Sequence, residues 1–135
     1  MDIYTGMKMT LTDTVRDSNT AKTLGSGSLL VYGTPAMLLL AEKTAVALLE
    51  GKLDNGMTTV GIRLDMEHVS ATPVGCKISC TVELKEIDRK KLTFAVEVSD
   101  PAGLIGKGSH ERFIVDSVKF QSRTDMKLQQ QAKEM

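Results

Sequence analysis

Residues 34–49 read TPAMLLLAEKTAVALL, and this stretch decides the fold. Thr34 stands where a helix N-cap is expected and Pro35 at the first helical position, where a missing amide hydrogen costs little. The residues from Ala36 to Leu49 are rich in alanine and leucine and are apolar on nearly every side. Helices of this composition are normally buried on most of their surface. We therefore predict a central helix that the rest of the chain covers.

Alternation of apolar and polar residues predicts strands on both sides of this helix. One strand precedes it and four follow it, with turns at Asp88-Arg89-Lys90 and at Asp100-Pro101-Ala102-Gly103. The five segments are residues 7–12, 60–68, 77–85, 92–98 and 104–118. This is an α+β order in which an apolar helix needs a sheet to wrap it. We predict a hotdog fold, an antiparallel sheet of about five strands around one long buried helix.

The remaining segments are polar. Residues 17–28 are rich in serine, asparagine, threonine and glycine, which predicts a mobile loop before the helix. The tail from Lys119 onward is rich in glutamine and lysine, and we expect a frayed helix there. A chain of 135 residues has the ordinary size of one domain. We expect that domain at residues 1–120, followed by a polar C-terminal tail at residues 121–135.

Composition narrows the classes of function. The 17 lysines and arginines balance 17 aspartates and glutamates, and the chain has no tryptophan, three phenylalanines and two tyrosines. A nucleic-acid partner, which favours a positive surface and aromatic stacking, is therefore not expected. The N-terminus has no apolar signal region, and the most apolar stretch is interrupted by Pro35, Glu42 and Lys43. We accordingly expect neither a signal peptide nor a membrane partner.

The cysteines and histidines suggest no disulfide and no metal. Cys76 and Cys80 lie on one face of a predicted strand, ~13 Å apart, which is too far for a disulfide. Reduced cysteines favour a cytoplasmic location. Together with His68 and His110, these cysteines match no zinc-binding spacing, so we expect no metal site.

Glu42 and His68 are polar residues in apolar surroundings. Glu42 lies on the flank of the apolar helix face, and no lysine or arginine stands three or four residues from it to form a helix ion pair. It is either a rim carboxylate, reaching water or a strand backbone, or a functional one. His68 continues the inward face of Leu64 and Met66, together with Ile62, and is either a satisfied core histidine or a functional residue partnered by Glu42.

Three further residues have both structural and functional interpretations. Thr34, besides capping the helix, would place a hydroxyl at its positive end, where an anion or a developing oxyanion is favoured. Gly61 weakens a strand interior, which indicates a bulge or a close approach of the backbone to another group, such as a ligand. Arg112, with His110 and Glu111 beside it, matches an ordinary polar position on a surface strand.

Four segments together resemble the fluoroacetyl-CoA thioesterase family of hotdog proteins. They are residues 34–42, 61–68, 70–75 and 106–112, and they include the strings Ala-Thr-Pro-Val-Gly and Gly-Lys-Gly-Ser-His-Glu-Arg. The resemblance implies an acyl-CoA thioesterase whose active site lies in the cleft between the two subunits of a homodimer, which could pair further into a tetramer. Coenzyme A would be part of the substrate, and no cofactor is implied.

The resemblance also implies roles for five residues. Thr34, Glu42 and His68 would be catalytic, with Glu42 as nucleophile or general base and His68 as proton shuttle. Gly61 and Arg112 would bind the substrate, Arg112 by holding either the site's carboxylate or a phosphate of coenzyme A.

One segment departs from the family pattern. The family's namesake carries bulky aromatic residues before the helix, whereas residues 24–28 read Leu-Gly-Ser-Gly-Ser here. A Gly/Ser loop cannot form the same apolar lid, so we expect a small or medium acyl group other than fluoroacetyl. Two alternatives stay open: a non-catalytic module of hotdog fold that binds or senses acyl-CoA, and an enoyl-CoA hydratase. The hydratase usually needs an Asp–His pair at a spacing that this sequence lacks.

Overall fold

The computed structural model describes residues 1–134 and confirms the α+β hotdog architecture. The strands are β1 (Lys8–Thr14), β2 (Met57–His68), β3 (Lys77–Asp88), β4 (Lys91–Asp100) and β5 (Gly103–Asp116). The helices are the 3-10 turn η1 (Asp17–Asn19), α1 (Ala21–Leu24), α2 (Thr34–Leu49) and α3 (Ser117–Glu134). Both predicted turns are confirmed, since β3 ends at Asp88 and β4 at Asp100, each followed closely by the next strand.

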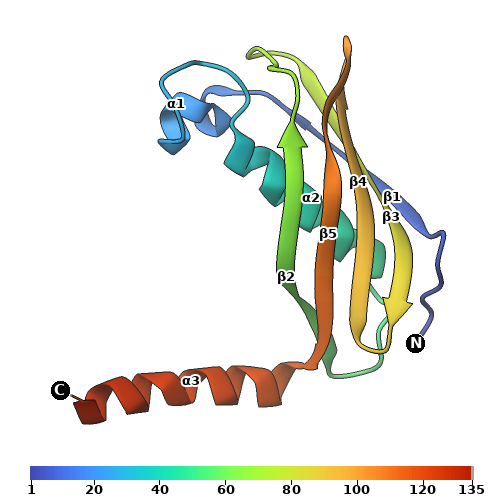
Figure 1. Cartoon of the computed structure of the whole chain (residues 1–135), viewed down its shortest axis with the longest axis vertical. Coiled ribbons are helices and arrows are strands. Elements are labelled where there is room, and N and C mark those ends of the chain that lie inside the picture. The colour runs from blue at the N-terminus through green and yellow to red at the C-terminus, as the bar shows by residue number, and fades with distance from the viewer. Residues whose placement is uncertain (135) are drawn as a thin grey trace.

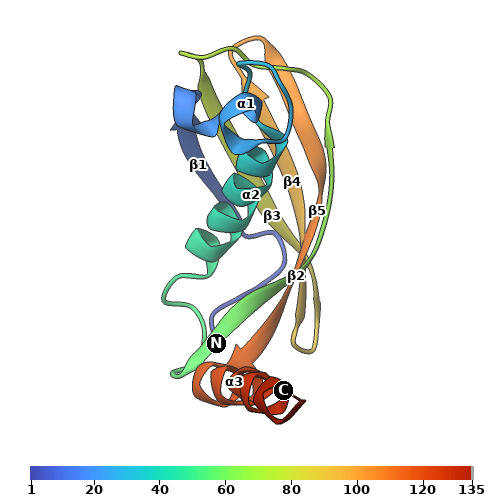
Figure 2. The same cartoon turned by 90° about the vertical axis from the view of Figure 1, so that its left-hand side faces the viewer.

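The five strands form one antiparallel sheet in the order β1-β3-β4-β5-β2, so β1 and β2 are its edges. The sheet curves around α2, which lies along its inner face (Figures 1 and 2). Alternate residues of β3 and β4 point inward and are fully buried against this helix, as the period-two pattern predicts. They are Ile78, Cys80, Val82, Leu84, Leu92, Phe94, Val96 and Val98.

One side of α2 is not covered by its own chain. The covered side of the helix includes the buried residues Met37, Ala41 and Ala45. On the uncovered side, Leu39 is 50% exposed and Val46 is 45% exposed. The predicted burial on most sides is therefore incomplete in the single chain. The bare apolar side offers surface that association with another subunit would remove from water.

The segment before α2 is more ordered than predicted. Residues 17–28 were expected as a mobile loop, but they contain η1 and α1, and the hydroxyl of Thr20 caps α1 by accepting from the Thr23 amide at 3.3 Å. The amide of Ala21 also donates to the carbonyl of Val31 at 2.8 Å. The prediction was wrong because the residues that favour loops are also those that cap short helices.

The C-terminal tail is one continuous helix, α3, which begins at Ser117 and has no buried residue among those described. It projects past the β2 edge of the sheet and away from the rest of the domain (Figures 1 and 2). Within residues 1–134 no helix is both long and apolar enough to cross a membrane.

Candidate active site

Thr34 and His68 form a direct pair at the start of α2. The first helix bond runs from the Met37 amide to the Gly33 carbonyl, so Gly33, with an extended backbone, is the N-cap. The predicted N-cap role of Thr34 is therefore wrong, because the helix begins one residue earlier than the capping pattern suggested. Thr34 is instead the first helical residue, and its Oγ1 lies 2.8 Å from Nδ1 of His68.

His68 is a half-buried imidazole at the end of β2. Burial lowers the pKa of His68, and donation from the ring toward the backbone of Ser70 opposes this only in part. The ring of Tyr32 meets it edge-on, with the ring centres 6.3 Å apart. Its Nε2 is buried and has no hydrogen-bond partner among residues 1–134. His68 also lines a pocket of about 310 Å³ with Tyr32 and Thr34, so a neutral imidazole with one free nitrogen borders an open space.

Glu42 lies in a second cluster, which is organised by Arg112. The guanidinium donates from Nε to Thr59 Oγ1 at 2.8 Å, from Nη2 to the Thr59 carbonyl at 3.1 Å, and from Nη1 to Glu42 Oε2 at 3.4 Å. Arg112 is only 6% exposed, so its expected position on a surface strand is wrong. The reason is strand alternation, since Arg112 shares the inward face of β5 with His110 and Ile114.

Gly61 is both a bulge and a site of close approach, as predicted. The register between β2 and β5 shifts between Gly61 and Arg63, which places Ile62 in the bulge. A Cβ on Gly61 would lie 2.6 Å from Glu42 Oε2 and 3.2 Å from Arg112 Nη1. The group that approaches the backbone is therefore the Glu42 carboxylate. The bulge also interrupts the alternation, which is why Ile62 is exposed and does not share the inward face of Leu64 and Met66.

His110 is the residue of this cluster that sequence reasoning missed. It is fully buried, its Nδ1 lies 2.8 Å from the Arg63 carbonyl, and its Nε2 lies 3.1 Å from Arg112 Nη1. Its ring stacks on Phe94, with the ring centres 6.1 Å apart. Burial lowers the pKa of His110, and the charge of Arg112 lowers it further. The signal in the sequence that could have identified His110 is its even spacing from Arg112 and Ile114, which places the three residues on one face of the strand.

The predicted site residues therefore form two groups that do not meet in one chain. Thr34 and Glu42 are eight residues apart on α2, which corresponds to about 12 Å along the helix. Gly61 and His68 are seven residues apart on β2, on the order of 20 Å along the strand. One group pairs Thr34 with His68, and the other gathers Glu42 and Arg112 around Gly61.

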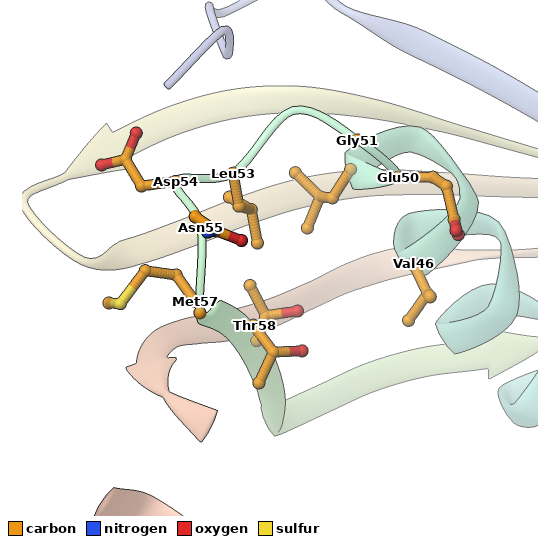
Figure 3. Close-up of a pocket in the computed structure, with 11 residues that line it drawn as sticks. Val46, Glu50, Gly51, Leu53, Asp54, Asn55, Met57 and Thr58 are labelled. Atoms are coloured by element: carbon orange, nitrogen blue, oxygen red, sulfur yellow. The ribbon is translucent and has the colours of Figure 1, made fainter. Parts of the chain in front are cut away.

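A second pocket, of about 350 Å³, adjoins the Glu42 cluster. It lies where α2 ends and β2 begins, between Val46 on the helix and Thr58 on the strand (Figure 3). Its lining includes Thr59, the residue that anchors Arg112. Each of the two groups of site residues thus has its own adjoining pocket.

Comparison with known proteins identifies the family. Residues 15–118 match the sequence profile of a family described as Fluoroacetyl-CoA-specific thioesterase. The chain belongs to this family. The match covers the Thr34–His68 pair and the whole Glu42 cluster.

Individual members support the assignment to the fluoroacetyl-CoA-specific thioesterase family. The fluoroacetyl-CoA thioesterase of Streptantibioticus cattleyicolor is 30% identical over 97 residues, which are 72% of this chain and 70% of that protein. The solved structure of the fluoroacetyl-CoA thioesterase FlK has a TM-score of 0.87 at 26% identity, covering 94% of this chain and 98% of that one. By membership of this family the protein is a thioester hydrolase.

A more distant structure shows the same fold. A Thermus thermophilus hypothetical protein, described as a thioesterase superfamily member, has a TM-score of 0.88 at 19% identity, covering 98% of each chain. The superposition includes nearly the full length of this chain.

Proposed function

We propose that the protein hydrolyses a small or medium acyl-CoA to the free acid and coenzyme A, with Thr34, Glu42 and His68 as catalytic residues. The observation that carries the proposal is the Glu42 carboxylate, which is ion-paired with a buried arginine and lies against the bare backbone of Gly61, within a thioesterase family. The outward-facing side of Glu42, whose side chain is 39% exposed, leaves room for a substrate.

The proposed chemistry requires an attacking group and a proton donor. Glu42 either attacks the thioester carbon itself or takes a proton from the water that attacks it. If water attacks, Glu42 passes the water's proton to the neutral imidazole of His68, which Thr34 orients, and the imidazolium protonates the thiolate that leaves when the carbon–sulfur bond breaks. If Glu42 attacks, the carbon–sulfur bond breaks to give an anhydride between Glu42 and the acyl group. Water then adds to this anhydride with His68 as base, which releases the free acid and Glu42, and the proton taken by His68 goes to the thiolate. A thiol with a pKa near 8.5 is a good leaving group, so the attack is the more demanding step. The N-terminal end of α2 at Thr34 favours negative charge developing on the carbonyl oxygen.

We further propose that two copies complete each site through their β2 edges. β2 is an edge strand, so its outer backbone groups are free to pair with the same strand of a second copy. Antiparallel pairing of β2 centred on Asp65 would, because Ile62 lies in the bulge, set Gly61 opposite the partner's His68 on the inward face. Glu42 of one subunit would then approach the Thr34–His68 pair of the other, and Leu39 and Val46 would be covered. The two pockets would also meet, which provides space for the acyl group and the pantetheine arm.

The acyl group is proposed to differ from fluoroacetyl. The loop before α2 carries Gly25, Ser26, Gly27 and Ser28, all exposed, and Ser26 lines the pocket beside His68. Residues 25–28 carry no aromatic side chain that could close that pocket, and the aromatic residue in its lining is Tyr32, so we propose that a larger acyl group can enter. A cytoplasmic location is also proposed, supported by the free thiols of Cys76 and Cys80.

The first experiment measures release of free coenzyme A with a thiol reagent across acetyl-, fluoroacetyl-, short-, medium-chain and aryl-acyl-CoA. Release that collapses in His68→Ala and in Glu42→Gln supports the proposal. Saturable binding of acyl-CoA without release favours the binding or sensor module. Hydration of enoyl-CoA without thiol release favours the hydratase.

A second experiment tests the shared site. Inactive Glu42→Gln and His68→Ala proteins are mixed in equal amounts and allowed to exchange subunits. If each site takes Glu42 from one subunit and His68 from the other, half of the dimers regain one intact site, and activity returns to about a quarter of wild type. Absence of recovery, when exchange is verified by mass, contradicts the shared site and leaves the thioesterase assignment standing.

A further inference from the structure

We infer that His110 is a positioning residue of the thioesterase site: its Nε2 accepts a hydrogen bond from Arg112 and thereby fixes the guanidinium that holds Glu42. The inference rests on the proposed function, because it matters only if Glu42 takes part in the reaction. His110 is not among the five site residues predicted from the sequence, and it acts on the reaction only through the residues that it contacts.

The contacts of His110 settle which of its nitrogens carries the proton. A guanidinium has only donors, so the Nε2 atom that faces Arg112 Nη1 at 3.1 Å must present its lone pair. The proton of the neutral ring then sits on Nδ1 and is donated to the Arg63 carbonyl at 2.8 Å. Each nitrogen has one partner and one role. This tautomer is the one in which both hydrogen bonds form.

The acceptor role of Nε2 determines where Nη1 of Arg112 points. The other end of the guanidinium is held by Thr59, through Nε and Nη2. Nη1 is shared between His110 and Glu42, and the Glu42 contact at 3.4 Å is the longest of the four. Without an acceptor at the His110 position, a buried Nη1 proton would be left unsatisfied, and the guanidinium would rotate to pair it.

The donor role of Nδ1 acts on the other side of the same site. The Arg63 carbonyl follows the bulge that brings the Gly61 backbone against Glu42. His110 therefore contacts both groups that confine the carboxylate, the Arg112 guanidinium and the bulged segment of β2. These two contacts can be separated by substitution, because they use different ring nitrogens.

The test compares His110→Gln with His110→Asn, each of which retains one of the two contacts. The Gln amide reaches as far as Nε2 and supplies an acceptor for Arg112, whereas the Asn amide reaches only as far as Nδ1 and supplies the donor for Arg63. We expect His110→Gln to keep kcat within about threefold of wild type and His110→Asn to lose about 10- to 100-fold, with KM little changed. In a Glu42→Gln background, His110→Asn should change the residual rate by less than about twofold.

Three kinetic outcomes would overturn the inference. They are equal losses of kcat in both variants, a larger loss in His110→Gln than in His110→Asn, and an undiminished effect of His110→Asn when Glu42 is already replaced. If wild type releases no coenzyme A, or Glu42→Gln is fully active, the proposed function fails instead. Because either variant could fail to fold, ¹⁵N NMR of the wild-type imidazole supplies an independent test. A protonated Nδ1 and an unprotonated Nε2 are expected at neutral pH, and the opposite tautomer would refute the inference.

Discussion

Adding one methyl group at Gly61 tests the geometry of the Glu42 cluster most directly. In Gly61→Ala the new Cβ would lie 2.6 Å from Glu42 Oε2, whereas ordinary contacts begin at 3.4 Å. The carboxylate must therefore withdraw by about 0.8 Å, the difference between these distances. Because it is the far end of a flexible side chain, it moves at little cost. Its 3.4 Å contact with Arg112 Nη1 is expected to break as it does so.

The expected magnitudes separate catalysis from stability. A misplacement approaching 1 Å at a reacting group can cost about 100-fold, so we expect kcat to fall by about 10- to 100-fold. Loss of the partly exposed Glu42–Arg112 ion pair is worth about 0–1 kcal/mol. Replacing glycine within a strand returns about 0.5–1 kcal/mol. The free energy of unfolding should therefore change by less than about 1 kcal/mol.

The assay is coenzyme A release under saturating substrate, with urea unfolding followed in parallel. Wild-type kcat in a folded Gly61→Ala protein would refute the argument, because it would mean that the position of the Glu42 carboxylate is unimportant. Parallel collapse of kcat and stability would indicate that the methyl group disrupts β2 in general. The double variant Gly61→Ala/Glu42→Gln is the control, and it should be no slower than Glu42→Gln alone, since both changes act on one carboxylate.

Three further predictions concern other parts of the molecule. Thr34→Ala should lower kcat about tenfold or more, while Thr34→Ser stays near wild type. Because Gly33 is the N-cap, the loss of stability of Thr34→Ala in thermal melting should be smaller than the ~1 kcal/mol that removal of an N-cap costs. Burial lowers the pKa of His68 and His110, so below pH ~6.5 the unfolded chain binds protons that the folded chain does not. Stability should then fall as pH drops from 7 to 5, by at most about 1.4 kcal/mol per pH unit for His110, and a flat profile of urea midpoints would contradict this. Half-buried Cys76 should react with a thiol reagent before buried Cys80, whose pKa burial raises, and equal fast labelling of both in native protein would contradict the burial.

The sequence predicted the fold because its patterns are unbroken over the segments that form the core. α2 is apolar on nearly every side, and the buried residues of β3 and β4 alternate without a break over residues 78–84 and 92–98. The errors fall where that condition fails. The bulge at Gly61 breaks the alternation of β2 and leaves Ile62 exposed, and Gly33 takes the cap position that the Thr34-Pro35 pair suggested for Thr34. A bulge and a one-residue shift in a cap depend on tertiary contacts, which periodicity does not record.

The candidate site was predictable only in part. Glu42 and His68 stand out because each is a polar residue in an apolar pattern. Arg112 and His110 do not, because β5 carries polar residues on both faces and its pattern does not tell which side is buried. Their positions follow from pairing with β2 across about 50 residues of sequence. The contact between Arg112 and Glu42, which spans 70 residues, exists only once the helix and the sheet have packed.

The separation of the two groups within one chain has a chemical consequence for the proposed reaction. A carboxylate in contact with His68 would raise the pKa of that imidazole and favour its charged form. In the single chain His68 instead meets Thr34 and the edge of Tyr32, and burial lowers its pKa, so the ring is neutral at pH 7. Glu42 meanwhile has its own cationic partner in Arg112. Each subunit would therefore bring a neutral histidine to one site and an ion-paired carboxylate to the other. His68 and Glu42 would each be held in its charge state in a separate part of the subunit, and they would meet around the substrate only when the subunits associate.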